Sequence, residues 1–194
     1  MDLNELRDRA YKTAYEHGFH DKELSNEHCL CLVISELMEA VEADRKGRHA
    51  DVVKFREWQG NSLALTEETR VKRFKEDFEA YIKDTVEDEL ADAAIRLLDL
   101  AGYRGITIET FTEEMIYEST ESCNDESFTE SIYAIAMIPV RFEYEYDYSF
   151  DKQLNSMLLG IIGLSNYMGI DLLWHVEQKM RYNELRENKH GKRY

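Results

Sequence analysis

The sequence predicts an all-α fold, a helical bundle that forms a single domain over residues 1–194. Apolar residues recur at helical spacing along most of the chain, and only nine Gly and one Pro interrupt it. Hydrophobic residues make up 43% of the chain and aromatic residues 11%, which is enough to build a sizeable core in spite of the high charge.

The first half of the chain predicts three helices and one long connection. Each helical run carries an apolar stripe and ends at or just before a glycine. In chain order, these helices cover residues 2–17, Ser25 or Asn26 to Gly47, and about Glu67 to Ala101. Residues 48–70 are expected to form the connection, and the third run is long enough to bend partway.

The second half predicts an acidic loop, Glu118 to Glu126, and three further helices. These helices are expected at residues 127–138, 151–167 and 171–188. Between the first two, aromatic and polar residues alternate over residues 140–150, which is a strand signal inside a helical protein. Two interpretations stay open for this segment: a short aromatic edge ribbon, or an aromatic loop packed on the bundle.

Charge and composition exclude several classes of partner. The net charge of −16 argues against a general nucleic-acid binder, because phosphate backbones repel such a surface. From Lys179 to Tyr194, however, six Lys or Arg stand against two Glu, which indicates a local anion site. The three cysteines are too few for a disulfide framework, and no run reaches membrane-spanning length. The sequence therefore predicts a cytoplasmic protein with no membrane partner.

Two pairs of acids flank the apolar stripes of the second and third helices. At 100° per residue, Glu36 and Glu39 lie on one flank of the first stripe, and Glu89 and Asp92 lie on the same-handed flank of the other. Either pair alone is typical of a solvated surface. If the two stripes pack together, however, four carboxylates converge and repel one another unless a divalent cation is bound. Oxygen ligands favour Mg²⁺, with Mn²⁺ as an alternative.

These motifs resemble a known enzyme family. SELMEAVEADRKG (35–47) followed by EDELADAAIRLLDLAG (87–102) resembles the MazG-like all-α nucleoside triphosphate pyrophosphohydrolases, a superfamily that includes dimeric dUTPases and dCTPases. The shared signature is E-x-x-E on one helix and E-x-x-D on the next. HVEQKMRYNELRENKHGKRY (175–194) is similar to the C-terminal segment of some members. Two departures are Ser35, where many members have Glu, and a longer spacing between the two acidic motifs.

The resemblance implies a reaction and a set of roles. A nucleoside triphosphate, NTP or dNTP, would be split to the monophosphate and pyrophosphate by a homodimer. The four acids would hold Mg²⁺, and Glu39, with Glu36 beside it, would be the catalytic residue that activates water. The candidate contacts to the substrate phosphates are Lys179, Asn183, Arg186, Lys192, Tyr194 and Arg96. Arg96 is alternatively expected to pair with Asp92.

Two other readings stay open. The fold could serve as a non-catalytic nucleotide-binding or regulatory module, or as a purely structural acidic bundle. The sequence does not fix the base or the sugar of a substrate.

A shift of 64 residues aligns Leu90, Leu100, Tyr103, Gly105 and Ile106 with Leu154, Leu164, Tyr167, Gly169 and Ile170, and replaces Glu89 and Asp92 by Gln153 and Ser156. Residues 127–188 are therefore predicted to be a degenerate repeat of the motif-bearing half, about residues 1–110. The repeat would complete the bundle without binding metal, and the basic C-terminal tail would follow it.

Overall fold

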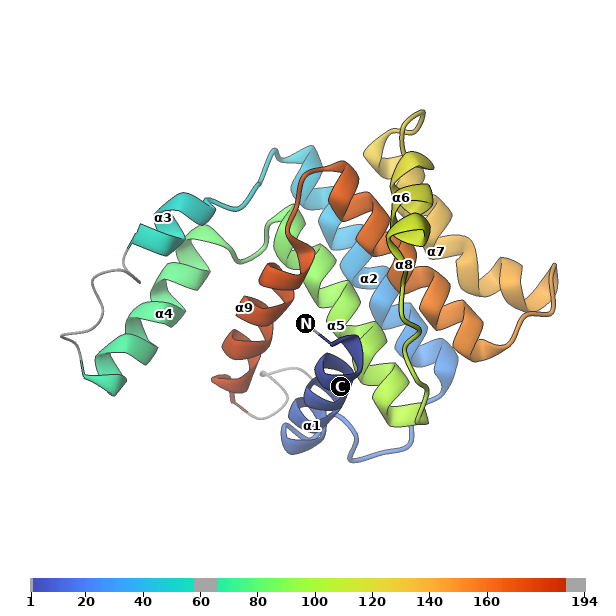
Figure 1. Cartoon of the computed structure of the whole chain (residues 1–194). Coiled ribbons are helices and arrows are strands. Elements are labelled where there is room, and N and C mark those ends of the chain that lie inside the picture. The colour runs from blue at the N-terminus through green and yellow to red at the C-terminus, as the bar shows by residue number, and fades with distance from the viewer. Residues whose placement is uncertain (1, 58–65, 188–194) are drawn as a thin grey trace.

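Two long helices, α5 (Val86–Arg104) and α8 (Phe150–Tyr167), pack against each other at the centre of the molecule (Figure 1). This computed structural model describes residues 2–57 and 66–187. The other helices are α1 (Leu3–Glu16), α2 (Asn26–Arg45), α3 (Val52–Glu57), α4 (Glu67–Tyr81), α6 (Glu113–Glu121), α7 (Phe128–Tyr144) and α9 (Leu172–Glu184). The described residues form no strand, so the prediction of an all-α fold is confirmed.

The helix starts follow local capping chemistry. Ser25 accepts a hydrogen bond from the backbone N–H of His28 at the start of α2, and Thr85 accepts one from Asp88 at the start of α5. Gly105, at φ 67°, ends α5 in the left-handed conformation that favours glycine. Helices α2 and α5 pack along their apolar stripes, which brings their acidic motifs to the same edge of the interface.

The packing relates the two halves of the chain. Helices α2 and α5 pack as a pair, and so do α7 and α8. The helix that follows each pair crosses over: α6 packs on α8, and α9 packs on α5. Helices α5 and α8 begin 64 residues apart, and each ends at a left-handed glycine, Gly105 and Gly169. A repeat would produce this arrangement, although the proposed ancestry stays a prediction.

Two glycines allow the outer helices to approach closely. A Cβ atom on Gly102 would lie 2.5 Å from Cβ of Tyr11, where α1 crosses α5. A Cβ atom on Gly163 would lie 2.7 Å from the backbone carbonyl carbon of Ser119, where α6 crosses α8. Any larger residue would force the helices apart.

Several predicted boundaries are wrong. Helix α3 lies inside the expected 48–70 connection, and α6 extends into the expected acidic loop. The third predicted helix, about Glu67 to Ala101, is not one bent helix. It is interrupted between α4 and α5, where Asp84 has a φ of 58°. The 140–150 segment is the end of α7, a turn and the start of α8. Its aromatic rings cluster around that turn, where the ring centroids of Phe142 and Tyr148 lie 4.9 Å apart. The interpretation of this segment as an edge ribbon is therefore wrong.

Helices α3 and α4 have their own apolar cluster apart from the main core. It consists of Phe55, Phe74, Phe78, Ile82 and Tyr182, and the last of these belongs to α9. Figure 1 shows α3 and α4 on the side of the molecule away from α6 and α7.

Among the described helices, none is by itself long and apolar enough to cross a membrane. Helices α8 and α9 meet that criterion only as a pair bent by 113°.

Candidate metal centre and adjoining cavity

Three carboxylates meet where the middle of α2 faces the first turns of α5. Oxygen atoms of Glu36, Glu89 and Asp92 all lie within 4.8 Å of one another. Glu36 and Glu89 are buried, at 3% and 5% exposure, and Asp92 is partly exposed. The positive end of the α5 helix dipole favours negative charge near its first turn, but three clustered acids also need cations.

Two basic side chains supply part of that compensation. Arg96 donates from Nε to Oε1 of Glu36 at 2.5 Å. Lys179 on α9 places its Nζ 2.7 Å from Oδ2 of Asp88 and 2.8 Å from Oδ2 of Asp92. Burial alone would lower the pKa of Lys179, but the charges of Asp92 and Asp88 outweigh it and raise that pKa. Lys179 therefore stays charged inside the protein.

Glu89 has no direct cationic partner among the described residues, although the nearby charge of Lys179 acts to lower its pKa. No described residue donates a hydrogen bond to its carboxylate or forms an ion pair with it, although it is almost fully buried. Burial, followed by the charge of Asp88, raises the pKa of Glu89 to about 9. Burial and the charge of Asp92 also raise the pKa of Glu36, against the opposing effect of Arg96. The cluster is thus short of positive charge at Glu89.

The donor set fits a small divalent cation. Carboxylate oxygens are hard ligands of the kind that Mg²⁺ and Mn²⁺ prefer, and the three carboxylates lie close enough for one ion to contact all of them. A buried, unpartnered carboxylate is costly, and a bound cation would remove that cost. The residues present therefore fit the ion that the acidic motifs imply.

The fourth predicted acid lies outside this cluster. Glu39 is exposed on α2, although it is near enough for its charge to raise the pKa of Glu36. Its predicted catalytic and metal-binding roles stay predictions. Asp88 is the acid that the sequence reasoning missed: it is 1% exposed, accepts from the N–H of Asp84 and leaves its Oδ1 without a hydrogen-bond partner among the described residues.

The predicted phosphate contacts divide into three groups. Lys179 and Arg96 form ion pairs with the acids of the cluster, and the partner of Arg96 is Glu36 rather than the expected Asp92. Asn183 and Arg186 lie one and two turns further along the C-terminal part of the chain and line a neighbouring cavity. Lys192 and Tyr194 lie outside the described residues.

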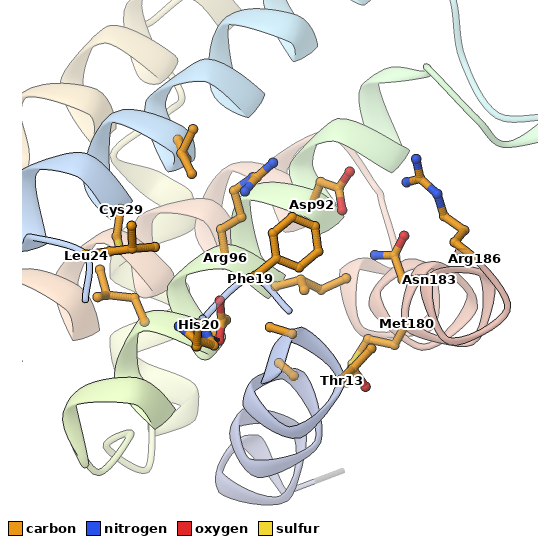
Figure 2. A pocket seen from close by; sticks show the side chains of 16 residues that line it. Thr13, Phe19, His20, Leu24, Cys29, Asp92, Arg96, Met180, Asn183 and Arg186 are labelled. Atoms are coloured by element: carbon orange, nitrogen blue, oxygen red, sulfur yellow. Dashed lines mark hydrogen bonds and ion pairs between the residues drawn. The ribbon is translucent and has the colours of Figure 1, made fainter. Parts of the chain in front are cut away.

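That cavity adjoins the acidic cluster and has a volume of about 100 Å³. Asp92 and Arg96 belong to both sites and form their shared wall (Figure 2). The remaining wall comes from other residues of α5, from α1, α2 and α9, and from the loop between α1 and α2. Its apolar lining includes Ala10, Ala14, Phe19, Leu24, Leu32, Ile95, Leu100 and Met180. The cavity is therefore an apolar recess beside a group of acids.

Comparison with protein-family models, curated proteins and solved structures gives no match to this chain. The resemblance to the MazG-like enzymes therefore stays a prediction, and the site has to be interpreted from its own chemistry.

Proposed function

We propose that the protein is a Mg²⁺-dependent hydrolase that converts a nucleoside triphosphate to the monophosphate and pyrophosphate. The observation that carries this proposal is the convergence of Glu36, Glu89 and Asp92, in which Glu89 is buried without a partner. The adjoining cavity adds a place for an uncharged part of the substrate next to the metal-binding acids.

Glu36, Glu89 and Asp92 would hold the ion. When bound, Mg²⁺ neutralises phosphate oxygens and lowers the pKa of water. Lys179 and Arg96 are fixed at the edge of the cluster by ion pairs, so their positive charges are already in place to attract a triphosphate.

The family resemblance assigns the role of proton acceptor to Glu39, whose exposed side chain lies near enough for its charge to raise the pKa of Glu36. In the proposed reaction, a water oxygen forms a bond to the α-phosphorus while the bond from that phosphorus to the bridging oxygen breaks. Pyrophosphate leaves with the bonding electrons, and the proton of the water passes to Glu39. The products are the monophosphate and pyrophosphate.

The decisive experiment measures pyrophosphate release from a panel of NTPs and dNTPs, with and without Mg²⁺ and with Mn²⁺ as a substitute. Glu36→Gln and Asp92→Asn should abolish release while the far-UV circular dichroism stays unchanged. Glu118→Gln, an exposed acid on α6, is the matched control and should retain activity.

Three outcomes separate the competing functions. Release that needs Mg²⁺ and is lost in both Glu36→Gln and Asp92→Asn supports the hydrolase. Nucleotide binding without release from any triphosphate would indicate the non-catalytic module instead. If neither nucleotides nor Mg²⁺ bind, and the two substitutions only raise stability, the acids are structural. Sedimentation equilibrium would test the homodimer that the family resemblance implies.

A further inference from the structure

A second cavity lies among the start of α1, the loop between α5 and α6, α6 itself, the end of α8 and the start of α9. Its volume is about 490 Å³, and clefts that bind ligands of drug size measure about 300–1,000 Å³. It shares no lining residue with the cavity beside the metal centre. The proposed hydrolysis therefore gives this second cavity no role.

The wall of the second cavity contains apolar side chains that the fold leaves only partly covered. These side chains are Leu3, Phe111, Ile116, Ile162 and Leu173. All of them except Ile116 also pack against the main core, so their positions are set before a ligand arrives. Apolar surface that stays in contact with water is a source of binding free energy for an apolar partner. The cavity is therefore suited to an apolar side chain of a ligand.

Among the described residues, every charged side chain that lines this cavity is acidic. Asp2, Glu109 and Asp171 are exposed, and none of them forms an ion pair with another described residue. Asp2 and Asp171 also cap α1 and α9, where they accept from the backbone N–H groups of Asn4 at 2.8 Å and of Trp174 at 3.1 Å. Three carboxylates around one apolar cavity attract a ligand with positive charge and repel an anionic one.

The acidic surface continues from the cavity onto α6. Residues 105–140 contain no Lys, Arg or His, and their eight acids are Glu109, Glu113, Glu114, Glu118, Glu121, Asp125, Glu126 and Glu130. The four acids of α6 among these are all exposed. Such a face repels nucleic acids and anionic membranes. A small amine would neutralise only the acids at the cavity, whereas a peptide with several basic residues would reach those of α6 as well.

We propose that this cavity and the acidic face of α6 together form a docking site for a basic segment of another protein. An apolar side chain of that segment enters the cavity, and Lys or Arg side chains on either side of it pair with Glu109, Asp171 and the acids of α6. The volume of about 490 Å³ leaves room for such an anchor, because about 150 Å³ accepts a benzene ring. The site does not depend on the function proposed above.

The two parts of the docking site contribute differently. Exposed ion pairs each add little to affinity, so most of the binding free energy comes from the apolar anchor. The acids raise the association rate and select for a basic partner, and added salt screens this effect. Binding should therefore need both the anchor and the basic residues, and it should weaken as the salt concentration rises.

The first test measures binding of labelled synthetic peptides to the full chain by fluorescence anisotropy. The panel contains a Leu-Phe pair flanked by Lys residues at varied spacing, and the best binder sets the reference Kd. Replacing its Lys residues by Glu, or its Leu-Phe pair by Ser-Ser, should weaken binding at least about tenfold. Glu109→Lys and Asn166→Trp, which places a ring at the exposed edge of the cavity, should weaken it similarly. The matched controls Glu68→Lys on α4 and Ala134→Trp on α7 alter exposed positions elsewhere and should leave the Kd unchanged.

The second test locates the bound peptide by methyl NMR. The best binder should shift the methyl signals of Leu3, Ile116 and Ile162, and a wild-type-like spectrum of each free variant shows that it is folded. Shifts confined to other methyl groups would overturn the inference, as would the absence of peptide binding to the folded wild type. Equal binding by Glu109→Lys and Asn166→Trp would also overturn it. Displacement of the peptide by spermine, or equal binding of the Ser-Ser peptide, would reduce the face to a general attraction for cations and overturn the role of the cavity.

Discussion

Glu89→Gln tests directly whether the buried acid needs a cation. In metal-free protein, the pKa of Glu89 rises from an ordinary value of 4.5 to about 9, mainly because the side chain is buried. The unfolded chain releases this proton above about pH 4.5, whereas the folded chain keeps it to about pH 9. Folding is therefore progressively disfavoured as the pH rises through this window.

The size of the effect on stability follows from the shift in the pKa of Glu89. At about 1.36 kcal/mol per pKa unit, the buried Glu89 lowers the free energy of unfolding by about 3 kcal/mol at pH 7 and by about 6 kcal/mol above pH 9. Glutamine keeps the shape and removes the titration, although its buried amide costs about 1–3 kcal/mol without a partner. We expect the variant and the wild type to be similar near pH 7, and the variant to be about 3 kcal/mol more stable near pH 9.

The assay is urea denaturation followed by far-UV circular dichroism, in EDTA, at intervals from about pH 6 to pH 9. Glu118→Gln is the control because Glu118 is exposed on α6. Adding Mg²⁺ should stabilise the wild type by mass action and have no such effect on Glu89→Gln. If the free energy of unfolding of Glu89→Gln has the same pH dependence as that of the wild type, the electrostatic account of the site is wrong.

Three further substitutions test the surrounding structure. Lys179→Met should lower the free energy of unfolding by about 3–5 kcal/mol in urea denaturation, because it leaves buried carboxylates uncompensated. Adding Asp88→Asn to this variant should restore part of that loss. Gly102→Ala should cost about 1–3 kcal/mol in thermal unfolding, because its Cβ would lie 2.5 Å from Cβ of Tyr11. Gln153→Ala should cost about 1–3 kcal/mol by removing a buried hydrogen bond, while a Mg²⁺ titration should show unchanged affinity.

Each of these expectations has a clear contrary result. Wild-type stability in Lys179→Met would mean that the buried ion pairs contribute nothing. Unchanged thermal stability in Gly102→Ala would show that α1 can shift away from α5 without loss of stability. Weaker Mg²⁺ affinity in Gln153→Ala would contradict the prediction that the second half of the chain does not bind metal.

Much of the fold follows from local signals in the sequence. Ser25 and Thr85 cap helices in the expected way, and the apolar stripes of α2 and α5 do pack together. Helix α3 was not predictable from periodicity, because six residues with one buried side chain, Phe55, are too short to show a pattern. The aromatic alternation at 140–150 was misleading because it spans two helix ends and a turn.

The sequence predicts only those features of the candidate site that depend on which face of its helix each acid occupies. The helical phase brings Glu36, Glu89 and Asp92 together, and Glu39, at about −160° from the centre of its stripe, is left exposed. The same reasoning puts Asp88 about 180° from Leu97, on the side expected to face solvent. Helix α9 covers that side with Lys179, a tertiary contact that no local pattern contains.

The separate packing of α3 and α4 sets how easily water reaches the buried ion pair. Their cluster contacts α9 through the stacked rings of Phe78 and Tyr182, whose centroids lie 4.4 Å apart, and through the edge-on contact of Phe55 with Trp174. Nζ of Lys179 lies 5.8 Å from the centre of the Phe78 ring. A small unit held by few apolar contacts opens before the whole domain does. Amide hydrogen exchange should therefore be faster in α4 than in α5, and each such opening would hydrate Lys179 while the central helices stay folded.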